Sequence, residues 1–261
     1  MRLVLQPVEL LYKYRSIIFQ TSRNDLRARF AGSFLGMFWL IFYPLLFLGA
    51  YSAVYIYVFN VRFNLMNSNE YVAIIFCGLI PFLGFAETLG AGVSCVVANA
   101  NLIKNTLFPI ELIPVKAVVT SQATQITGLI MLLIATFFLG KASVWTPFVI
   151  VIWVLQIIFS IGLIWILSSI NVFARDLQNI VSILVLFLML ISPIAYPVDM
   201  IPATLRPLLG ANPLYYIIVS YQDVLMYGQF PRGNIFWIFL IFSLITFFLG
   251  YWFFSRMKAV F

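Results

Sequence analysis

The sequence predicts an all-α, polytopic membrane protein with six transmembrane helices, and three observations lead to that fold class. Of the 261 residues, 64% are hydrophobic and only 9% are charged, with a mean hydropathy of +1.07. A water-soluble domain carries about 25% charged residues, so this chain could not cover its own surface in water. Uncharged apolar runs of about 20 residues, enough to cross a bilayer as a helix, recur along the chain. The sequence does not show the alternating segments of about 10 residues that are typical of a membrane β-barrel.

The first element is an amphipathic helix over residues 8–22, which we expect to lie in the bilayer interface. The segment VELLYKYRSIIFQ (8–20) puts on one helical face Val8, Leu11, Tyr12, Ile18 and Phe19. The opposite face carries Lys13, Ser16 and Gln20, with Arg15 at the edge. A leader that is merely bound at the surface is the alternative. Eight charges in residues 1–29 argue against a cleavable signal peptide.

Six spans follow within a single transmembrane domain, 1–261. They are predicted over 30–61, 71–98, 117–139, 147–172, 177–195 and 234–254. Residues 196–232 hold five prolines and no unbroken apolar run of about 20 residues. We therefore expect two short re-entrant helices there instead of a seventh span.

The distribution of basic residues predicts the orientation. With six spans, both termini share one side with the loops near 99–116 and 173–177. Eleven of the fifteen basic residues fall on that side: Arg2, Lys13, Arg15, Arg23, Arg27, Arg29, Lys104, Lys116, Arg175, Arg256 and Lys258. Cytoplasmic loops carry the excess of Lys and Arg, so we expect both termini in the cytoplasm. The net charge of +7 is thus attributed to topology and not to nucleic acid binding.

Residues 99–114 (NANLIKNTLFPIELIP) form a polar break after the second span. Asn99 or Asn101 can cap a short helix, from which Leu102 and Ile103 would project. Pro109 would end that helix, and Pro114 suits the first turn of the third span. The pattern predicts a rigid coupling helix over 99–108 that docks in a groove of a cytoplasmic protein. An ordinary tight loop is the alternative.

Five segments, in order over about 210 residues, resemble one family. They are SRNDLRARFAGSFLGMFW (22–39), NANLIKNTLFPIELIPV (99–115), NVFARDLQNIV (171–181), SPIAYPVDMIP (192–202) and NPLYYIIVSYQDVLMYGQFP (212–231). The chain resembles the transmembrane permease of the type-2 ABC exporters that carry lipid-linked polysaccharides such as O-antigens, capsules and teichoic acids. The resemblance implies a homodimer in the bacterial cytoplasmic membrane with two copies of an ATPase, surrounded by membrane lipid, and a polyprenyl-linked polysaccharide as substrate.

The resemblance also implies roles for particular residues. The ATPase-coupling set is Asn101, Leu102, Ile103, Lys104, Asn105 and Phe108, with Arg175 and Asp176 in the second cytoplasmic connection. The outer gate within 196–232 would include Tyr196, Tyr215, Tyr216, Tyr221 and Asp223. Gln222 stands where the family pattern leads us to expect Arg, so a charge pairing or a lipid-headgroup contact of that Arg is in doubt here. Packing alone would also explain the tyrosines.

A substrate conduit is indicated by aromatic residues in the first span. They recur at every fourth position: Trp39, Tyr43, Phe47, Tyr51, Tyr55 and Phe59. Such a line spirals slowly around a helix, and its rings could stack on sugars along a pore, or simply fill a core. Glu87, deep in the second span, is by default functional. It could contact substrate, sit protonated at a helix contact among small residues, or serve a proton relay.

The predicted function is the permease of an ATP-driven polysaccharide exporter, not an enzyme. No G-x-x-x-x-G-K-[ST] phosphate loop is present, so ATP and Mg²⁺ would be used by the partner ATPase. We expect no cofactor and no metal, because His is absent and the two cysteines suggest neither a disulfide nor a metal site. The alternatives are an ion-coupled secondary transporter centred on Glu87, an ABC exporter of a drug or small lipid, and a membrane-embedded glycosyl- or acyltransferase.

Overall fold

The computed structural model describes residues 2–58, 68–100, 109–196 and 206–260, and every regular element in these ranges is helical. The first helices are α1 (Arg2–Lys13), α2 (Arg15–Arg29), α3 (Trp39–Ala53), α4 (Ser68–Gly92) and α5 (Cys95–Ala98). They are followed by α7 (Leu112–Phe138), α8 (Val149–Phe173), α9 (Leu177–Ile191), α10 (Arg206–Ala211), α11 (Pro213–Leu225) and α12 (Ile235–Met257). The all-α polytopic class is therefore confirmed.

Among the described residues, five helical segments are long and apolar enough to cross a membrane: Gly36–Val58, Asn69–Gly92, Leu112–Phe138, Thr146–Phe173 and Ile235–Met257. They coincide with five of the six predicted spans. The predicted span 177–195 corresponds to α9, which has 15 residues and is shorter than the usual length for crossing. Six crossings thus stay a prediction. The second span ends earlier than expected, at Gly92, and the third begins earlier, at Leu112, with Pro114 in its first turn as predicted.

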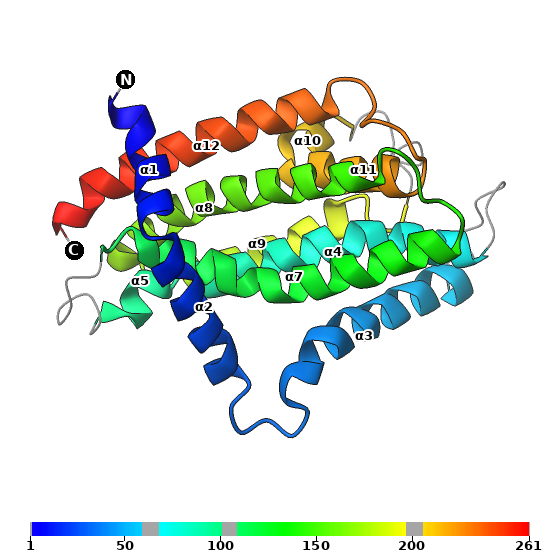
Figure 1. The fold of residues 1–261 in the computed structure, drawn as a ribbon, viewed down its shortest axis with the longest axis horizontal. Helices are drawn as coiled ribbons and strands as arrows, with labels where there is room; N and C mark the ends of the chain where they lie inside the picture. The colour runs from blue at the N-terminus through cyan, green and yellow to red at the C-terminus, as the bar shows by residue number, and fades with distance from the viewer. Residues whose placement is uncertain (1, 59–67, 101–108, 197–205, 261) are drawn as a thin grey trace.

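The long helices α4, α7, α8 and α12 run side by side, and α4 lies at the centre of the bundle (Figure 1). Within the span Asn69–Gly92, 83% of an apolar stretch of 18 residues is buried inside the protein, whereas in the span Gly36–Val58 the buried share is 6%. Helices α8 and α12 approach closely because both carry glycine at the crossing. A Cβ added at Gly162 would collide with the backbone of Thr246, and one at Gly250 would collide with Gly162.

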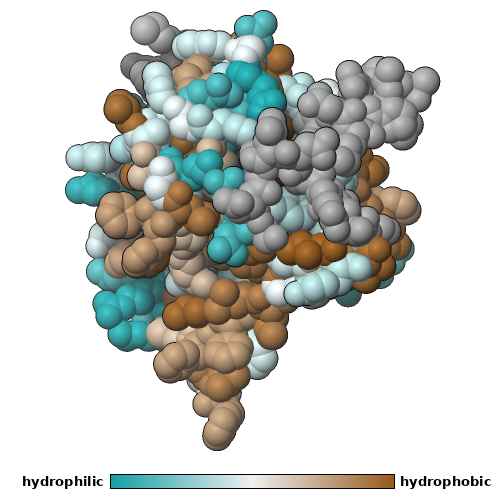
Figure 2. All heavy atoms as spheres, turned by 90° about the vertical axis from the view of Figure 1, so that its right-hand side faces the viewer, coloured by the Kyte–Doolittle hydropathy of each residue, from teal (hydrophilic) through white to brown (hydrophobic). Residues whose placement is uncertain are grey.

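Helices α1 and α2 cross one end of the bundle, and α2 then leaves it to form a V with α3 (Figure 1). The tip of the V, residues 30–35, projects from the molecule. Figure 2 shows that this projection is covered with hydrophobic side chains, and the exposed ones there include Phe34, Met37 and Phe38. An apolar projection of this kind is what a membrane interface would cover.

The predicted apolar face of the 8–22 helix is divided in the structure, so its prediction as one face was wrong. Leu11 and Ile18 pack against the core, whereas Val8, Tyr12 and Phe19 are more than half exposed. The reason is that the bundle lies beneath a different stripe of α2, which a helical wheel alone cannot reveal. The exposed side chains of Val8, Tyr12 and Phe19 remain available to lipid.

The predicted pair of short helices before the last span is present as α10 and α11. Helix α11 begins at Pro213 after Asn212, whose side chain accepts a hydrogen bond from Leu214 N at 3.0 Å. The Asn212 amide also donates to Ser192 Oγ at 2.9 Å, which fixes α11 to the end of α9. Residues 197–205 of the predicted gate segment lie outside the described residues. The re-entrant path stays a prediction.

Candidate functional site

A cleft of about 900 Å³ lies between α2, the start of α3, and the bundle helices α4 and α7. Charged and polar side chains line one part of it, and the aromatic rings of Trp39 and Tyr43 line another. The polar residues at the cleft are Asp25, Arg29, Glu87, Asn99, Lys116, Thr120, Ser121 and Thr124. In a chain with 9% charged residues, four charges in one cleft mark it as the candidate site.

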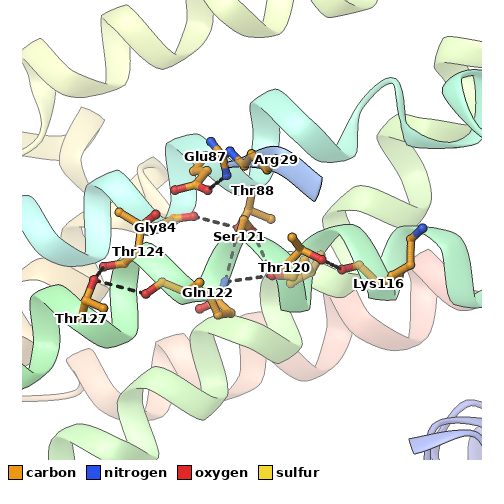
Figure 3. A network of polar contacts seen from close by, with 12 residues as sticks. Arg29, Gly84, Glu87, Thr88, Lys116, Thr120, Ser121, Gln122, Thr124 and Thr127 are labelled. Carbon is orange, nitrogen blue, oxygen red and sulfur yellow. Dashed lines mark hydrogen bonds and ion pairs between the residues drawn. The ribbon is translucent and has the colours of Figure 1, made fainter. Parts of the chain in front are cut away.

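Helix α2 holds the cleft together through a polar stripe. Ser22, Asp25 and Arg29 follow Ile18 at spacings of four, three and four, so they lie on one face of the helix. Asp25 Oδ2 pairs with Lys116 Nζ at 2.8 Å, and Ser22 Oγ donates to Lys116 O at 3.3 Å. Arg29 pairs with Glu87 of α4 (Figure 3). The two pairs cancel, leaving the cleft without net charge from these four groups.

The floor of the cleft continues into a network of hydroxyls and amides between α4 and α7 (Figure 3), which a residue of α8 joins. Thr88 Oγ1 lies 2.6 Å from Ser121 Oγ, and Gln122 Nε2 donates to Thr88 Oγ1 at 3.3 Å. Trp153 Nε1 of α8 donates to Gln122 Oε1 at 3.0 Å. Sequence reasoning missed this network. The signal was the run TSQATQIT (120–127), since polar side chains inside a span usually mark function.

Glu87 lines the cleft with an Arg partner. Its side chain is 12% exposed, and the ion pair with Arg29 joins residues 58 positions apart. The small-residue face expected beside it is present, because Gly84 lies directly under the side chain of Gln125. The group is thus placed where substrate could reach it, and its role stays a prediction.

The structure divides the predicted aromatic line of the first span. Trp39 and Tyr43 line the cleft, whereas Phe47, Tyr51 and Tyr55 pack against the core. The rings form neighbouring pairs, with centroids 4.9 Å apart for Tyr43 and Phe47 and 5.9 Å apart for Tyr51 and Tyr55. Phe59 lies outside the described residues. A continuous aromatic conduit therefore stays a prediction.

The candidate gate tyrosines have different surroundings. Tyr221 is fully buried and binds Gln125 inside the bundle, so its hydroxyl faces the core instead of a gate surface. Tyr215 and Tyr216 are partly buried neighbours with ring centroids 5.2 Å apart, and Tyr216 Oη donates to Gly210 O at 2.8 Å. Tyr196 Oη donates to Ile191 O at 2.8 Å, at the end of α9.

Asp223, also predicted for the gate, is fully buried and has an Arg partner from another position. Arg232 Nε donates to Asp223 Oδ1 at 2.9 Å, Nη2 donates to the same oxygen at 2.5 Å, and the Arg232 backbone N–H donates to Oδ2 at 2.9 Å. These bonds to the carboxylate raise the pKa of the Arg232 guanidinium above its usual value. The buried carboxylate of Asp223 thus has a charge partner in Arg232, while the consequence of Gln222 for the gate stays open.

Most of the predicted coupling set, Asn101, Leu102, Ile103, Lys104, Asn105 and Phe108, lies outside the described residues. Asn99 ends α5, and its side-chain amide donates to Cys95 O at 2.8 Å. The helix that Asn99 is expected to cap lies outside the described residues, so that cap stays a prediction. Arg175 and Asp176 are exposed, and no ion pair joins them to each other.

A contact missed from the sequence lies just after the predicted coupling segment. Glu111 is buried at the start of α7 and pairs with Lys258 at the end of α12. Trp165 Nε1 of α8 donates to Glu111 O at 2.9 Å. The point where the polar segment rejoins the bundle is therefore fixed to two other long helices.

Comparison with known proteins places this architecture among transporters. The family model described as ABC-2 type transporter matches residues 17–230. The chain is 29% identical over 234 residues to an O-antigen export system permease protein of Myxococcus xanthus, which covers 88% of each chain. It is 30% identical over 209 residues to the corresponding protein of Klebsiella pneumoniae, covering 79% of each. A polysialic acid transport protein of Escherichia coli is 26% identical over 230 residues, which are 87% of this chain and 88% of that protein.

Proposed function

Because the chain belongs to the ABC-2 type transporter family and is the permease of a polysaccharide ABC exporter, we propose that it moves a polysaccharide on a polyprenyl-type lipid across the bacterial cytoplasmic membrane. Two relatives are named as O-antigen export permeases and a third as a polysialic acid transport protein, which supports a long, hydrophilic cargo. The lipid anchor is supported by the apolar projection beside the cleft.

The cleft between α2, α3, α4 and α7 is the proposed entrance for the sugar at the lipid-linked end. The observation that supports it is the combination of side chains in one place. Trp39 and Tyr43 offer ring faces on which a sugar can stack, while Glu87, Thr120 and Thr124 offer oxygen atoms to its hydroxyls. A volume of about 900 Å³ lies within the usual range of ligand pockets. Its cancelled charges suit a neutral sugar better than a free anion.

The energy source in this proposal is a separate ATPase, with two permeases and two ATPases in the assembly. The chain has no phosphate loop of its own. Movement of the ATPase would be received by residues 99–108 and passed on through Glu111, which is tied to α8 and α12. The two permeases would meet through α3 and α9, whose outward apolar residues include Leu46, Ile183, Leu186, Phe187 and Leu190.

Transport into vesicles tests both the ATP requirement and the cleft. Permease and ATPase are reconstituted together, and uptake of a lipid-linked oligosaccharide is followed with and without ATP. We expect ATP-dependent uptake that falls at least tenfold in Trp39→Ala, while ATP hydrolysis continues. The matched control is Trp237→Ala, because Trp237 is exposed on α12 and does not line the cleft.

Equal uptake by Trp39→Ala and the parent would contradict the cleft assignment. Uptake that survives without ATP and stops in Glu87→Gln would instead identify an ion-coupled transporter. Uptake of a small drug or free lipid in place of the oligosaccharide would leave the ABC mechanism intact and change the cargo.

A further inference from the structure

Two glutamines lie buried in the middle of the helix bundle. Gln125 lies midway along α7, and Gln156 lies on α8; each is 1% exposed. Neither lines the cleft, and neither belongs to the proposed coupling segment. Burying an amide in such an apolar place costs free energy unless its donors and acceptors form hydrogen bonds. The partners of these two side chains therefore show which helices have to meet here.

The two amides pair with each other in both directions. Gln125 Nε2 donates to Gln156 Oε1 at 2.7 Å, and Gln156 Nε2 donates to Gln125 Oε1 at 3.2 Å. The second N–H of each amide reaches another helix. Gln156 donates to Pro81 O of α4 at 2.9 Å, and Gln125 donates to Tyr221 Oη of α11 at 3.3 Å. All four N–H donors are used, and four helices meet at this pair.

The backbone of α4 is shaped to receive this amide pair. A Cβ added at Gly84 would collide with the amide of Gln125, so only glycine leaves room for that side chain here. Tyr221, the residue on α11 that binds Gln125, is fully buried. Neighbouring apolar residues of α11, Ile217, Ile218 and Val224, are also buried but do not specify one rotation of the helix. The hydroxyl of Tyr221 favours one rotation of α11, because it has to reach the side-chain amide of Gln125.

The amide pair lies one helical turn along α7 from a second hydrogen-bonded group, which reaches the wall of the cleft. Gln122 lies one turn before Gln125 on α7 and binds Thr88, which in turn contacts Ser121 at the cleft. The polar side of α7 thus runs from the cleft to α11.

We propose that Gln125 and Gln156 are positioning residues for α11: their amide pair, through Tyr221, sets the position and rotation at which α11 lies against α4, α7 and α8. The inference rests on the proposed function in one respect, namely that α11 belongs to the outer gate. In that case the same pair connects a change of α7 at the cleft to the position of the gate helix.

The position of α11 is measured by the distance between two spin labels on the full chain in lipid nanodiscs. Ala211→Cys lies next to α11, and Ala142→Cys lies in the connection between α7 and α8; both sites are exposed. Cys77 and Cys95 are buried and stay in place, with a sample lacking introduced cysteines as the labelling background.

The main variant is the double change Gln125→Leu and Gln156→Leu, which removes both amides and leaves an apolar pair of similar volume. We expect a broadened or second distance peak, and a tenfold loss of uptake per ATP hydrolysed in the reconstituted exporter. Tyr221→Phe removes the hydroxyl that binds Gln125, and we expect it to change the distance distribution in the same way as the double variant. The matched control is Ser160→Ala, one turn further along α8, because the Ser160 hydroxyl is buried and makes no hydrogen bond among the described residues.

A purely structural role predicts a lower thermal midpoint but the parental distance in the protein that remains folded. The parental distance distribution in Tyr221→Phe, or in a folded double variant, would therefore overturn the inference. This readout needs neither cargo nor ATPase, so it is independent of the proposed export. A displaced α11 together with unchanged export would uphold the positioning role and overturn the gate assignment.

Discussion

The ion pair of Asp223 and Arg232 shows how the fold depends on individual polar residues. Asp223 is fully buried at the end of α11, while the side chain of Arg232 is half exposed in the loop that leads to α12. The guanidinium binds the carboxylate through two nitrogens, and the loop backbone adds a third bond. Gln222, at the position where an Arg was expected, donates to Pro193 O at 3.3 Å instead. The buried carboxylate therefore depends on Arg232 for its charge partner.

Replacement of Arg232 by Gln should lower the thermal midpoint of the folded protein. Breaking a buried ion pair by removing one partner typically costs about 3–5 kcal/mol, and the half-exposed position of Arg232 brings the expected loss to the lower end of that range. Arg232→Lys should recover only part, because an ammonium lacks the planar fork. Arg23→Gln, at an exposed position of α2, is the control, and midpoints are measured by thermal unfolding in detergent. A midpoint of Arg232→Gln equal to that of the control would rule out this dependence.

Helix α2 shows how an element can have two different partners. Its polar stripe, Ser22, Asp25 and Arg29, faces α7 and α4, and the outward side of the α1–α2 segment carries Tyr12 and Phe19. A surface helix usually turns its apolar stripe toward the core. Here the polar stripe faces the bundle and exposed aromatic side chains face outward, as expected for a helix that lies between a polar cleft and lipid. Two partly exposed ion pairs and the buried residues Ile18 and Ser22 hold it on the bundle, and the ion pairs contribute only a small part of that stability.

Charge exchange across the cleft tests whether α2 must stay on the bundle for export. Arg29→Glu puts two carboxylates opposite each other and should reduce ATP-dependent uptake severalfold. The double variant Arg29→Glu with Glu87→Arg restores opposite charges and should recover much of the uptake. Arg27→Glu, on the opposite face of the same helix, controls for the change in net charge. If the double variant is as poor as Arg29→Glu, the ion pair itself is not what export requires.

At the scale of the whole molecule, the ion pairs of the described residues, apart from Arg29–Glu87 in the cleft, lie toward the two ends of an apolar bundle. The pairs Asp25–Lys116 and Glu111–Lys258 lie at the end where α2 crosses, and Lys141 pairs with Glu70 at 3.0 Å at the other. Between these ends the bundle holds neutral polar groups, among them the Gln125–Gln156 pair. This separation is the one a bilayer imposes, since charges are expensive in hydrocarbon and neutral amides can pair.

The proposed orientation can be tested by labelling with a membrane-impermeant thiol reagent in whole cells. Ala174→Cys, between α8 and α9, should be labelled only after the membrane is opened. Ala142→Cys, between α7 and α8, should be labelled in intact cells; both positions are exposed. Buried Cys77 and Cys95 serve as the unlabelled background. Labelling of Ala174→Cys in intact cells would reverse the orientation and remove residues 99–108 from the reach of a cytoplasmic ATPase.

The sequence by itself determined the class of the molecule, the approximate places of five long helices and the resemblance that the family match confirms. These follow from runs of apolar residues and from local motifs, which need no knowledge of distant segments. Only the tertiary structure decided which polar groups meet: Arg29 with Glu87, Arg232 with Asp223, and Gln125 with Gln156 and Tyr221. The physical reason is that a partner depends on how each helix is rotated and packed against others. An apolar span leaves that rotation open, because almost every side of it is equally hydrophobic.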